Sequence, residues 1–373
     1  MKTNLFAVVL FFFTGMKLSL GQITINMPLP SQKAFISQRI GLTDISMEYH
    51  RPSVNGRKIW GGLVPYEFNS PGPTGSDAPW RTGANDNPIF SITHDIKIEG
   101  KDIKAGKYGF FVAVNENNTA TVVLSKDTRS WGSFFYDPKQ DVLRVNVNTK
   151  TIPNVELLTF SFDEVKPESA ILSLKWADKE IPVRIDVDVD NIVINDFKEQ
   201  FKNPVAFSWH SRQLAATYLL GRKSNLSQAL EWANQSIYGL PGGFTGEKNF
   251  VTLTTKESIL FLMDSIPQSK ETLAEALKVT NAGNTALGAV NFYGRSLITA
   301  KRKEDALTVF TFMLKEWPNV PASKIGMGRA LSANGNYKEA LKYITEALAT
   351  VPPAQKKTLE GFIELLKQGK DIN

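Results

Sequence analysis

The period of the hydrophobic residues changes once along this chain, and the change separates two kinds of fold. From Ser37 to about Val189, apolar residues recur at every second position, as in strands with one buried face. After about Asn195 they recur with the spacing of amphipathic helices, about 3.6 residues. Strands followed by helices predict separate β and α domains, an α+β organisation, and argue against a parallel βαβ enzyme fold.

The first region, residues 31–190, is predicted to be an antiparallel β-sandwich or barrel-like domain. Segments such as FSITHDIKI (Phe90–Ile98) and VLRVNVN (Val142–Asn148) alternate apolar and polar side chains. Turn pairs such as Asn55-Gly56 separate about nine runs of this kind, a spacing typical of sandwiches and barrels.

The second region, residues 195–373, contains an internal repeat. ALTVFTFMLKEWP (Ala306–Pro318) and ALKYITEALATVP (Ala340–Pro352) are offset by 34 residues, and ALEWANQSIYGLP (Ala229–Pro241) has the same frame. The alanines let helices approach closely, and the proline ends the second helix of each pair. The pattern resembles the tetratricopeptide repeat and predicts an all-α solenoid, whose concave face commonly takes a protein or peptide partner. The alternative is an irregular helical domain.

Residues 1–21 are predicted to be a secretory signal peptide. Lys2 gives a positive start, Leu5–Met16 an apolar run, and Ser19-Leu20-Gly21 a cleavage pattern of small residues. The alternative, an uncleaved anchor, needs an apolar run of roughly 20 residues, and this one is much shorter. We therefore expect an exported protein, periplasmic or secreted after cleavage near Gly21, without a transmembrane segment in the mature chain.

Composition narrows the chemistry that a site can use. The chain has no cysteine, so disulfides, thiolate metal sites and cysteine nucleophiles are excluded. The formal charge of +6 is spread along the chain, so no nucleic-acid partner is expected. The sequence contains no histidine pair with metal-ligand spacing, no nucleophile motif and no nucleotide-binding loop. We therefore predict no metal, no cofactor and no catalytic residue.

The candidate ligand-binding residues lie in YHRPSVNGRKIWGGLVPYEF (Tyr49–Phe68) and PWRTGAN (Pro79–Asn85). They are cations, tryptophans and one amide: Arg51, Lys58, Trp60, Trp80, Arg81 and Asn85. Arginine binds carboxylate, sulfate or phosphate and tryptophan stacks on sugar rings, so the group suits an acidic glycan or an anionic peptide end. The alternative is structural: the tryptophans fill the core, the glycines form corners and the arginines pair with acids.

Four segments resemble the domain-of-unknown-function family number 2911: SQRIGLTDISMEYHRPSVNGRKIWGGLVPY, WRTGANDNPIFSITHDIKIEGKDIKAGKYGFF, WGSFFYDPKQDVLRVNV and TFSF. That family is found mostly in secreted proteins of Bacteroidetes, often with helical repeats behind the domain. The resemblance covers roughly residues 31–188 and implies an exported bacterial protein, without a known activity. The chain departs from the family at EFNSPGPTGSDAP (Glu67–Pro79), an insert that we expect to be an exposed loop.

These observations lead to three hypotheses about function. The first is an exported, non-enzymatic binding or scaffold protein, with a protein or peptide partner on the helical repeats. The second is a glycan-binding or carbohydrate-active protein that uses the arginines and tryptophans of the β-domain. The third is a hydrolase with His50 as the base, since this histidine lies beside the candidate cluster.

Overall fold

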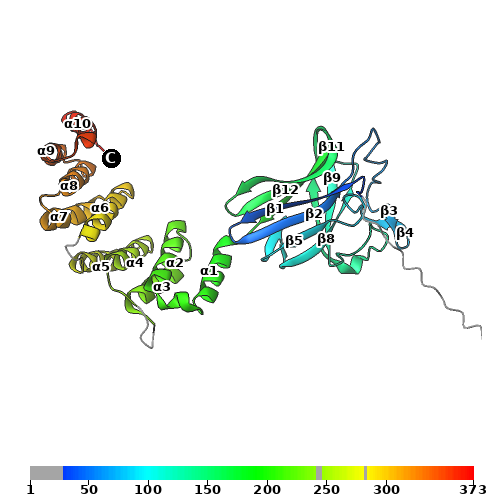
Figure 1. The fold of residues 1–373 in the computed structure, drawn as a ribbon, viewed down its shortest axis with the longest axis horizontal. Helices are drawn as coiled ribbons and strands as arrows, with labels where there is room; N and C mark the ends of the chain where they lie inside the picture. The colour runs from blue at the N-terminus through cyan, green and yellow to red at the C-terminus, as the bar shows by residue number, and fades with distance from the viewer. Residues whose placement is uncertain (1–27, 241–245, 281–283) are drawn as a thin grey trace, which may run out of the picture. The chain divides into compact units, whose positions relative to one another are not determined.

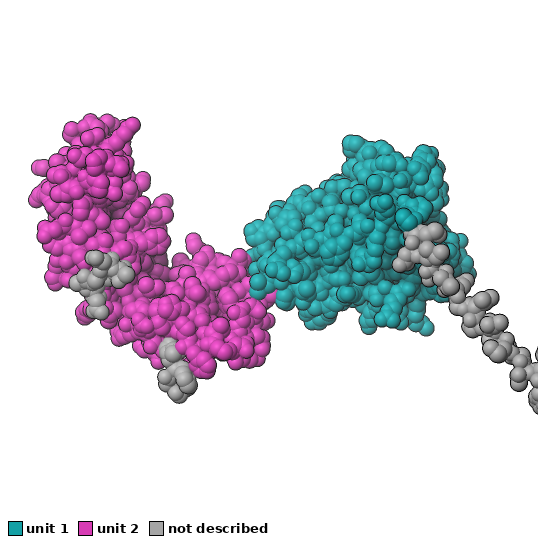
Figure 2. Space-filling model, in the orientation of Figure 1, with its two compact units in different colours: residues 1–189 teal, residues 190–373 magenta. Residues whose placement is uncertain are grey.

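The computed structural model describes residues 28–240, 246–280 and 284–373. The chain forms two compact units, residues 1–189 and residues 190–373 (Figures 1 and 2). The described part of the first unit is mostly antiparallel sheet, and that of the second unit is mostly α-helix. This order confirms the fold class expected from the change of hydrophobic period.

From residue 28 onward, the first unit, here called the β-unit, contains two main sheets and a hairpin, all antiparallel. The larger sheet has the order β1 (Gln32–Ile40), β2 (Thr43–Arg51), β5 (Ile89–Ile92), β8 (Gly106–Val114), β9 (Thr119–Ser125) and β10 (Asp141–Asn148). The smaller sheet has the order β11 (Lys150–Lys166), β12 (Ser169–Asp186), β6 (Ile96–Ile98) and β7 (Lys101–Ile103). The hairpin is formed by β3 (Ser70–Gly72) and β4 (Gly75–Ala78), and a 3-10 turn, Pro138–Gln140, precedes β10.

Aromatic side chains join the two main sheets into a sandwich. Tyr49 on β2 meets Phe160 on β11 with 4.8 Å between ring centroids, and Phe160 meets Phe110 on β8 at 5.5 Å. All three rings are buried, and each buried ring of this size stabilises a fold by about 1.5–3 kcal/mol. The Tyr49 hydroxyl accepts a hydrogen bond from the Phe160 amide (3.1 Å), so its polar end is also satisfied.

The alternation of Phe90–Ile98 predicts a single strand, but the structure divides this segment between two strands. Its first half is β5 in the larger sheet and its second half is β6 in the smaller sheet. At the corner between them, the Asp95 carboxylate accepts hydrogen bonds from the Ala105 amide (2.9 Å) and the Lys104 ammonium (2.8 Å). The apolar alternation runs on through the corner because both halves face the same core, so periodicity alone does not reveal the change of sheet.

The insert Glu67–Pro79 is predicted to be an exposed loop, but in the structure it contains the β3–β4 hairpin. Most of its side chains are exposed, but Ser70 and Ala78 are buried. Ala78 packs against Phe111 in a small cluster on the larger sheet. Glycine, proline and serine are as typical of tight hairpins as of loops, which is why composition did not distinguish them.

The described part of the second unit, here called the helical unit, consists of α1 followed by four helix pairs and a final helix (Figure 1). The helices are α1 (Val189–Gln200), α2 (Trp209–Arg222), α3 (Leu226–Tyr238), α4 (Phe250–Leu262), α5 (Ile266–Lys278), α6 (Asn284–Thr299), α7 (Lys303–Glu316), α8 (Pro321–Ala333), α9 (Tyr337–Leu348) and α10 (Pro353–Lys367). A 3-10 turn, Pro204–Phe207, precedes α2. None of the described helices combines the length and apolarity needed to cross a membrane.

The four helix pairs share the same connecting turn. In each pair, a leucine carbonyl near the end of the first helix accepts a hydrogen bond from the amide five residues later, at 2.9–3.2 Å; these leucines are Leu219, Leu260, Leu297 and Leu331. Such a bond satisfies a carbonyl that the helix end leaves without an intrahelical partner. Because each pair closes in this way, the pairs form equivalent units of one repeat.

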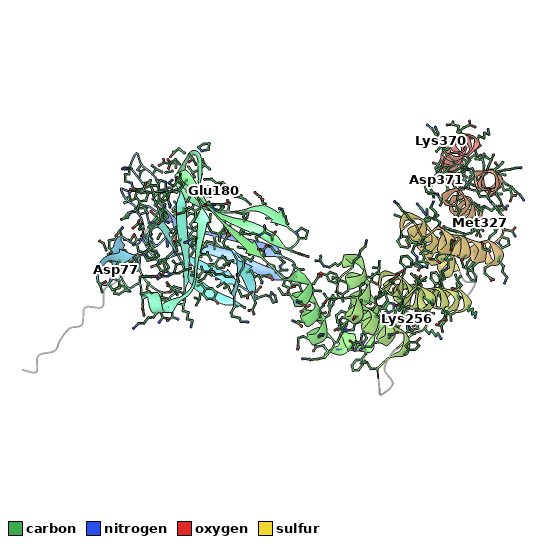
Figure 3. The ribbon with its side chains drawn as sticks, turned by 180° about the vertical axis from the view of Figure 1, so that it is seen from behind. Asp77, Glu180, Lys256, Met327, Lys370 and Asp371 are labelled. Carbon is green, nitrogen blue, oxygen red and sulfur yellow. The ribbon has the colours of Figure 1, made fainter. Side chains whose placement is uncertain are left out.

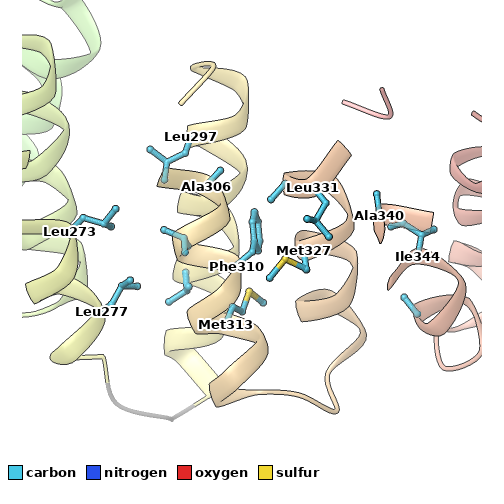
Figure 4. Close-up of a cluster of buried hydrophobic side chains, with 14 of the residues drawn as sticks. Leu273, Leu277, Leu297, Ala306, Phe310, Met313, Met327, Leu331, Ala340 and Ile344 are labelled. Carbon is cyan, nitrogen blue, oxygen red and sulfur yellow. The ribbon is translucent and has the colours of Figure 1, made fainter. Parts of the chain in front are cut away.

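Close packing explains the sequence pattern of the repeat. Ala306 and Ala340 are fully buried near the start of α7 and α9 (Figure 4). A Cβ added to Gly294 would lie 2.7 Å from the Phe310 ring, and one added to Gly328 would lie 2.7 Å from Ile344. Glycine and alanine are therefore required where neighbouring helices approach most closely.

The end of the chain returns to α8 after α10. The amide of Ile372 donates a hydrogen bond to the Ser332 hydroxyl (3.1 Å), which itself donates to the Asp371 carboxylate (2.7 Å). Ile372 is buried in the same apolar cluster as Met327, and Figure 3 shows Asp371 and Met327 in this last part of the helical unit. The tail therefore closes one end of the helical core.

Candidate functional site

A cleft of about 560 Å³ lies where the two candidate segments of the β-unit meet. This volume is within the range of small-molecule sites, about 300–1,000 Å³. The wall combines turn residues, hydroxyls, aromatic rings and two arginines: Pro30, Ser31, Pro52, Ser53, Asn55, Arg57, Leu63, Pro65, Ser70, Pro71, Trp80, Arg81, Gly83, Ala84, Ser133, Phe134 and Trp176. Ser70 and Pro71 belong to the inserted hairpin, so the insert forms part of the wall.

Three tryptophans form one cluster beside the cleft. Trp80 and Trp176 stack with 5.7 Å between centroids, and Trp60 meets both rings edge-on at 5.8 and 6.2 Å. The Trp80 backbone exchanges two hydrogen bonds of 2.9 Å with Val112 on β8, which fixes the ring. Trp60 and Trp80 are each only 7 % exposed. The cluster is therefore mainly core, with Trp80 and Trp176 reaching the cleft and Trp60 behind them.

The glycines and the polar turn of the first segment shape the backbone. Asn55 and Gly56 both have positive φ (49° and 68°), as in the tight turns of β-hairpins. Gly61 also has positive φ (68°), and a Cβ on Gly62 would lie 2.4 Å from the Lys58 carbonyl oxygen. These residues are needed for the turns themselves.

Two of the predicted cations do not face the cleft. The Arg51 guanidinium donates to the Leu158 carbonyl (2.9 Å) and the Thr159 hydroxyl (2.6 Å), so it joins β2 to β11. Lys58 is exposed and lies outside the cleft wall. Arg57, by contrast, lines the cleft, but its guanidinium donates to the carbonyls of Ser53 and Val54. These contacts leave Arg81 as the cation most available to a ligand.

Arg81 is half-buried and has no hydrogen bond or ion pair to any residue that the structure describes. Burial lowers the pKa of its guanidinium, and the charge of Asp86 acts weakly in the opposite direction. The guanidinium carbon lies 5.4 Å from the centroid of the Trp131 ring. A Cβ added to Gly132 would lie 2.4 Å from an Arg81 terminal nitrogen. Packing against Trp131 and Gly132, rather than a counter-charge, therefore holds Arg81 in place.

Other donors around the cleft also lack acceptors. The indole nitrogens of Trp60 and Trp176 and the amide nitrogen of Asn85 are buried without a hydrogen-bond partner among the described residues. Asn85 has positive φ (61°), a conformation that residues with side chains adopt rarely. All three nitrogens are closed to solvent, and Trp60 and Asn85 do not line the cleft, so these donors belong to the core around the site.

The sequence did not indicate a second set of aromatic residues at this place, here called the aromatic rim: Trp131, Phe134 and Phe135. Their exposed fractions are 55 %, 43 % and 70 %. The rings of Trp131 and Phe134 are nearly parallel (11°), with 5.9 Å between centroids. They lie in WGSFFYD, one of the segments that carries the family resemblance, but an aromatic run usually indicates core, so exposure was not expected.

His50 lies in a different and smaller cavity of about 290 Å³. Its ring is buried, and burial lowers its pKa, with smaller effects of Asp86, Lys33 and Glu48. No described side chain forms a hydrogen bond with the ring, so the role of His50 as a base stays a prediction. Within the described ranges there is no group of three or more side chains suited to hold a metal ion.

The comparison with protein families identifies the region that contains the cleft. Residues 31–185 match the family described as Protein of unknown function (DUF2911). The DUF2911 region includes all the candidate residues and the aromatic rim. The match also confirms the resemblance that the four sequence segments indicate, and the family description carries no activity.

Behind the DUF2911 region, the helical unit is similar to solved structures of helical repeats. One is a Podosopora anserina protein named for kinesin light chain, with nearly identical TPR-like repeats (12% identity, TM-score 0.32, 43% of this chain and 85% of that chain). A single-substitution variant of that protein gives 13% identity and a TM-score of 0.31, with the same coverage. None of the curated proteins matches this chain.

Proposed function

We propose that this chain is an exported, non-enzymatic binding protein whose β-unit captures an anionic ligand in the cleft at Arg81. The observation that carries the proposal is the half-buried Arg81 guanidinium, which has no polar partner among the described residues. A charge withdrawn from water without a counter-charge destabilises a protein. An incoming carboxylate, sulfate or phosphate relieves that cost and forms short, charge-assisted hydrogen bonds.

The remaining groups of the wall suit a ligand with both polar and apolar parts. They include the hydroxyls of several serines and the rings of Trp80, Phe134 and Trp176. The Ser133 hydroxyl donates to the Pro79 carbonyl (2.7 Å), which leaves its oxygen free to accept. The cleft therefore offers an arginine with unused donors, several hydroxyls and apolar ring surface, the usual composition of a small-molecule site.

Calorimetric titration of the full chain with acetate, sulfate and phosphate tests the proposal. The Arg81→Met variant is expected to lower the affinity by at least tenfold, because a hydrogen bond to a charged group contributes about 1.5–3 kcal/mol. Lys58→Met is the matched control, since it removes the same charge outside the cleft. Equal affinities of the two variants would remove the basis of the proposal.

The helical unit is proposed to bind a protein or peptide partner. Leu214 on α2 and Phe292 on α6 are exposed, and each lies five residues before the equivalent turn leucine, Leu219 or Leu297. Exposed apolar side chains at the same repeat position suit a partner that follows the stacked helices. Capture by the full chain should be lost in Phe292→Ser and kept in Phe135→Ser, which changes an exposed ring of the β-unit.

Export is supported by the apolar N-terminal segment. The predicted signal peptide, residues 1–21, lies outside the described residues. If it is cleaved near Gly21, the intact mass of the protein isolated from its native host should correspond to a chain beginning at Gln22. A mass that includes Met1 would contradict the proposed cleavage.

A further inference from the structure

We infer that the ligand of the cleft is a carboxylated sugar within a glycan, with its carboxylate on Arg81 and an adjoining ring on Trp131 and Phe134. This inference rests on the proposed function, and it adds the chemical class of the ligand and a second contact surface. It draws on three observations: the position of the aromatic rim, the balance of donors and acceptors in the cleft wall, and the unused donors of Arg81.

The aromatic rim and Arg81 form one continuous surface. Phe134 lines the cleft, and Trp131 lies directly against the Arg81 guanidinium, 5.4 Å from ring centroid to carbon. Both rings are largely open to solvent, although aromatic side chains of this size are normally buried. A ligand that reaches Arg81 therefore also passes over a flat apolar surface, which an inorganic anion does not use. The apolar C–H face of a sugar ring matches such a surface.

The balance of donors and acceptors favours a sugar over a peptide. Apart from the arginines, the polar side chains of the wall are mainly the hydroxyls of Ser31, Ser53, Ser70 and Ser133. Sugar hydroxyls donate as well as accept, so they match such groups, whereas each backbone amide or carbonyl of a peptide end can only donate or only accept. The Ser133 hydroxyl donates to the Pro79 carbonyl, and its oxygen keeps lone pairs that can accept from a sugar hydroxyl.

The number of unused donors favours a group that a single guanidinium can hold. Arg81 is the cation of the wall whose donors are unused, because Arg57 donates to backbone carbonyls. A carboxylate carries one negative charge and two acceptor oxygens, which fit the fork of one guanidinium.

Calorimetric titration of the full chain with three probes tests the ligand class: trigalacturonate, its methyl ester and triglutamate. Trigalacturonate is expected to bind, with an affinity at least tenfold higher than that of either other probe. Removal of part of the rim by Phe134→Ala should lower trigalacturonate affinity about tenfold and leave triglutamate unchanged. Phe35→Ala, which removes an exposed ring from β1, is the matched control and should have no effect.

The outcomes separate this inference from the proposed function. If triglutamate binds as tightly as trigalacturonate, and Phe134→Ala changes neither, the sugar is wrong and the anion site at Arg81 stands. If the methyl ester binds as tightly as the acid, Arg81 does not recognise an anion and the proposed function falls. If no probe binds but acetate or sulfate does in an Arg81-dependent manner, only the sugar class is overturned.

Discussion

Arg81 in the β-unit and Arg302 in the helical unit are both withdrawn from water, but only Arg302 has polar partners among the residues that the structure describes. The Arg302 side chain is 6 % exposed and donates to the Glu257 carboxylate, which is fully buried. It also donates to Asp305 at 2.7 and 2.9 Å and lies 3.9 Å from the centroid of the Phe261 ring. Arg81 has an aromatic neighbour too, but no polar partner among the described residues.

The pKa shifts of the two arginines are opposite. Burial alone lowers the pKa of Arg302, but the hydrogen bonds to Glu257 and Asp305 and the charge of Glu257 outweigh burial and raise it. For Arg81, burial dominates and the pKa is lowered. Burial and the charge of Glu257 raise the pKa of the neighbouring Tyr293 hydroxyl, which donates to that carboxylate. Arg302 therefore stabilises the fold through its partners, whereas the donors of Arg81 remain unused.

The position of Glu257 in the repeat shows how such a network is built. It lies three residues before the turn leucine Leu260, where the next two pairs have Gly294 and Gly328. The facing residue is Ser269, whose hydroxyl donates to Glu257 at 2.6 Å. One pair of helices thus replaces close apolar contact by a buried ion pair in which both charges have several partners.

The largest predicted effect is a loss of stability of the helical unit when Arg302 loses its main counter-charge. Glu257→Ala leaves Arg302 buried with a weaker counter-charge and should lower the free energy of unfolding of the helical unit by about 3–5 kcal/mol. Urea unfolding followed by circular dichroism at 222 nm, where helices dominate, measures this value. Glu304→Ala, an exposed change on α7, should have almost no effect, and a similar loss in both variants would refute the network's importance.

A double variant sharpens this result. Glu257→Leu combined with Arg302→Met replaces both charges with apolar groups and should recover most of the stability lost in Glu257→Ala. If the double variant is as unstable as the single one, packing rather than the unpaired charge explains the loss.

The next largest effect is expected at Gly132, which packs against the Arg81 guanidinium. Gly132→Ala introduces a Cβ 2.4 Å from an Arg81 nitrogen, at a backbone position with φ of 73°. We expect the β-unit to lose about 1–2 kcal/mol of stability, because non-glycine residues are strained there. The variant should also bind anions more weakly, since the guanidinium must move. Gly100→Ala, at φ of 77° with no atom near its Cβ, separates backbone strain from displacement.

A smaller change in the stability of the β-unit is expected when Arg81 itself is replaced. Arg81→Met removes no hydrogen bond to a described residue, so the stability of the β-unit should change by only about 0.5 kcal/mol. Urea unfolding followed by tryptophan fluorescence measures this change. A loss comparable to that of Glu257→Ala would mean that Arg81 is also a structural residue, and the contrast between the two would disappear.

The smallest effect is a pH dependence at His50, a third ionisable group withdrawn from water. Its pKa is lowered from 6.5 by burial, so the folded state resists protonation of the ring. The stability of the β-unit is therefore fully present above pH 6.5 and falls as the pH decreases toward the lowered pKa. His50→Gln should flatten this part of the pH profile of the unfolding midpoint. An unchanged profile would exclude His50 as its source.

Much of the fold could be predicted from the sequence because both hydrophobic periods are long and regular. The separation into strands and helices and the repeat of Ala306 and Ala340 are local patterns with a direct physical cause. The change of sheet after β5 was missed because both sheets share one core. The hairpin in Glu67–Pro79 was missed because its residues are equally typical of loops.

The candidate site could be predicted only in part, because partners distant in sequence decide what each residue does. Arg51 and Arg81 look alike in the sequence, but the groups that bind Arg51 lie more than 100 residues away, at Leu158 and Thr159. Trp131 and Phe134 were missed because exposure cannot be read from composition. The Glu257 network was also missed, although alignment of the repeats shows a charge where the neighbouring pairs have glycine.

The most direct test of the account is an NMR titration that observes both arginines in one sample. In the ¹⁵N–¹H spectrum of the arginine side chains, the Nε–H signal of Arg81 should exchange rapidly with water in the free protein. Addition of trigalacturonate or acetate should shift this signal and slow its exchange, while the signal of Arg302 stays fixed and protected. If the Arg81 signal is already protected in the free protein, or does not respond to any anion, the claim that Arg81 is an open ligand site is contradicted.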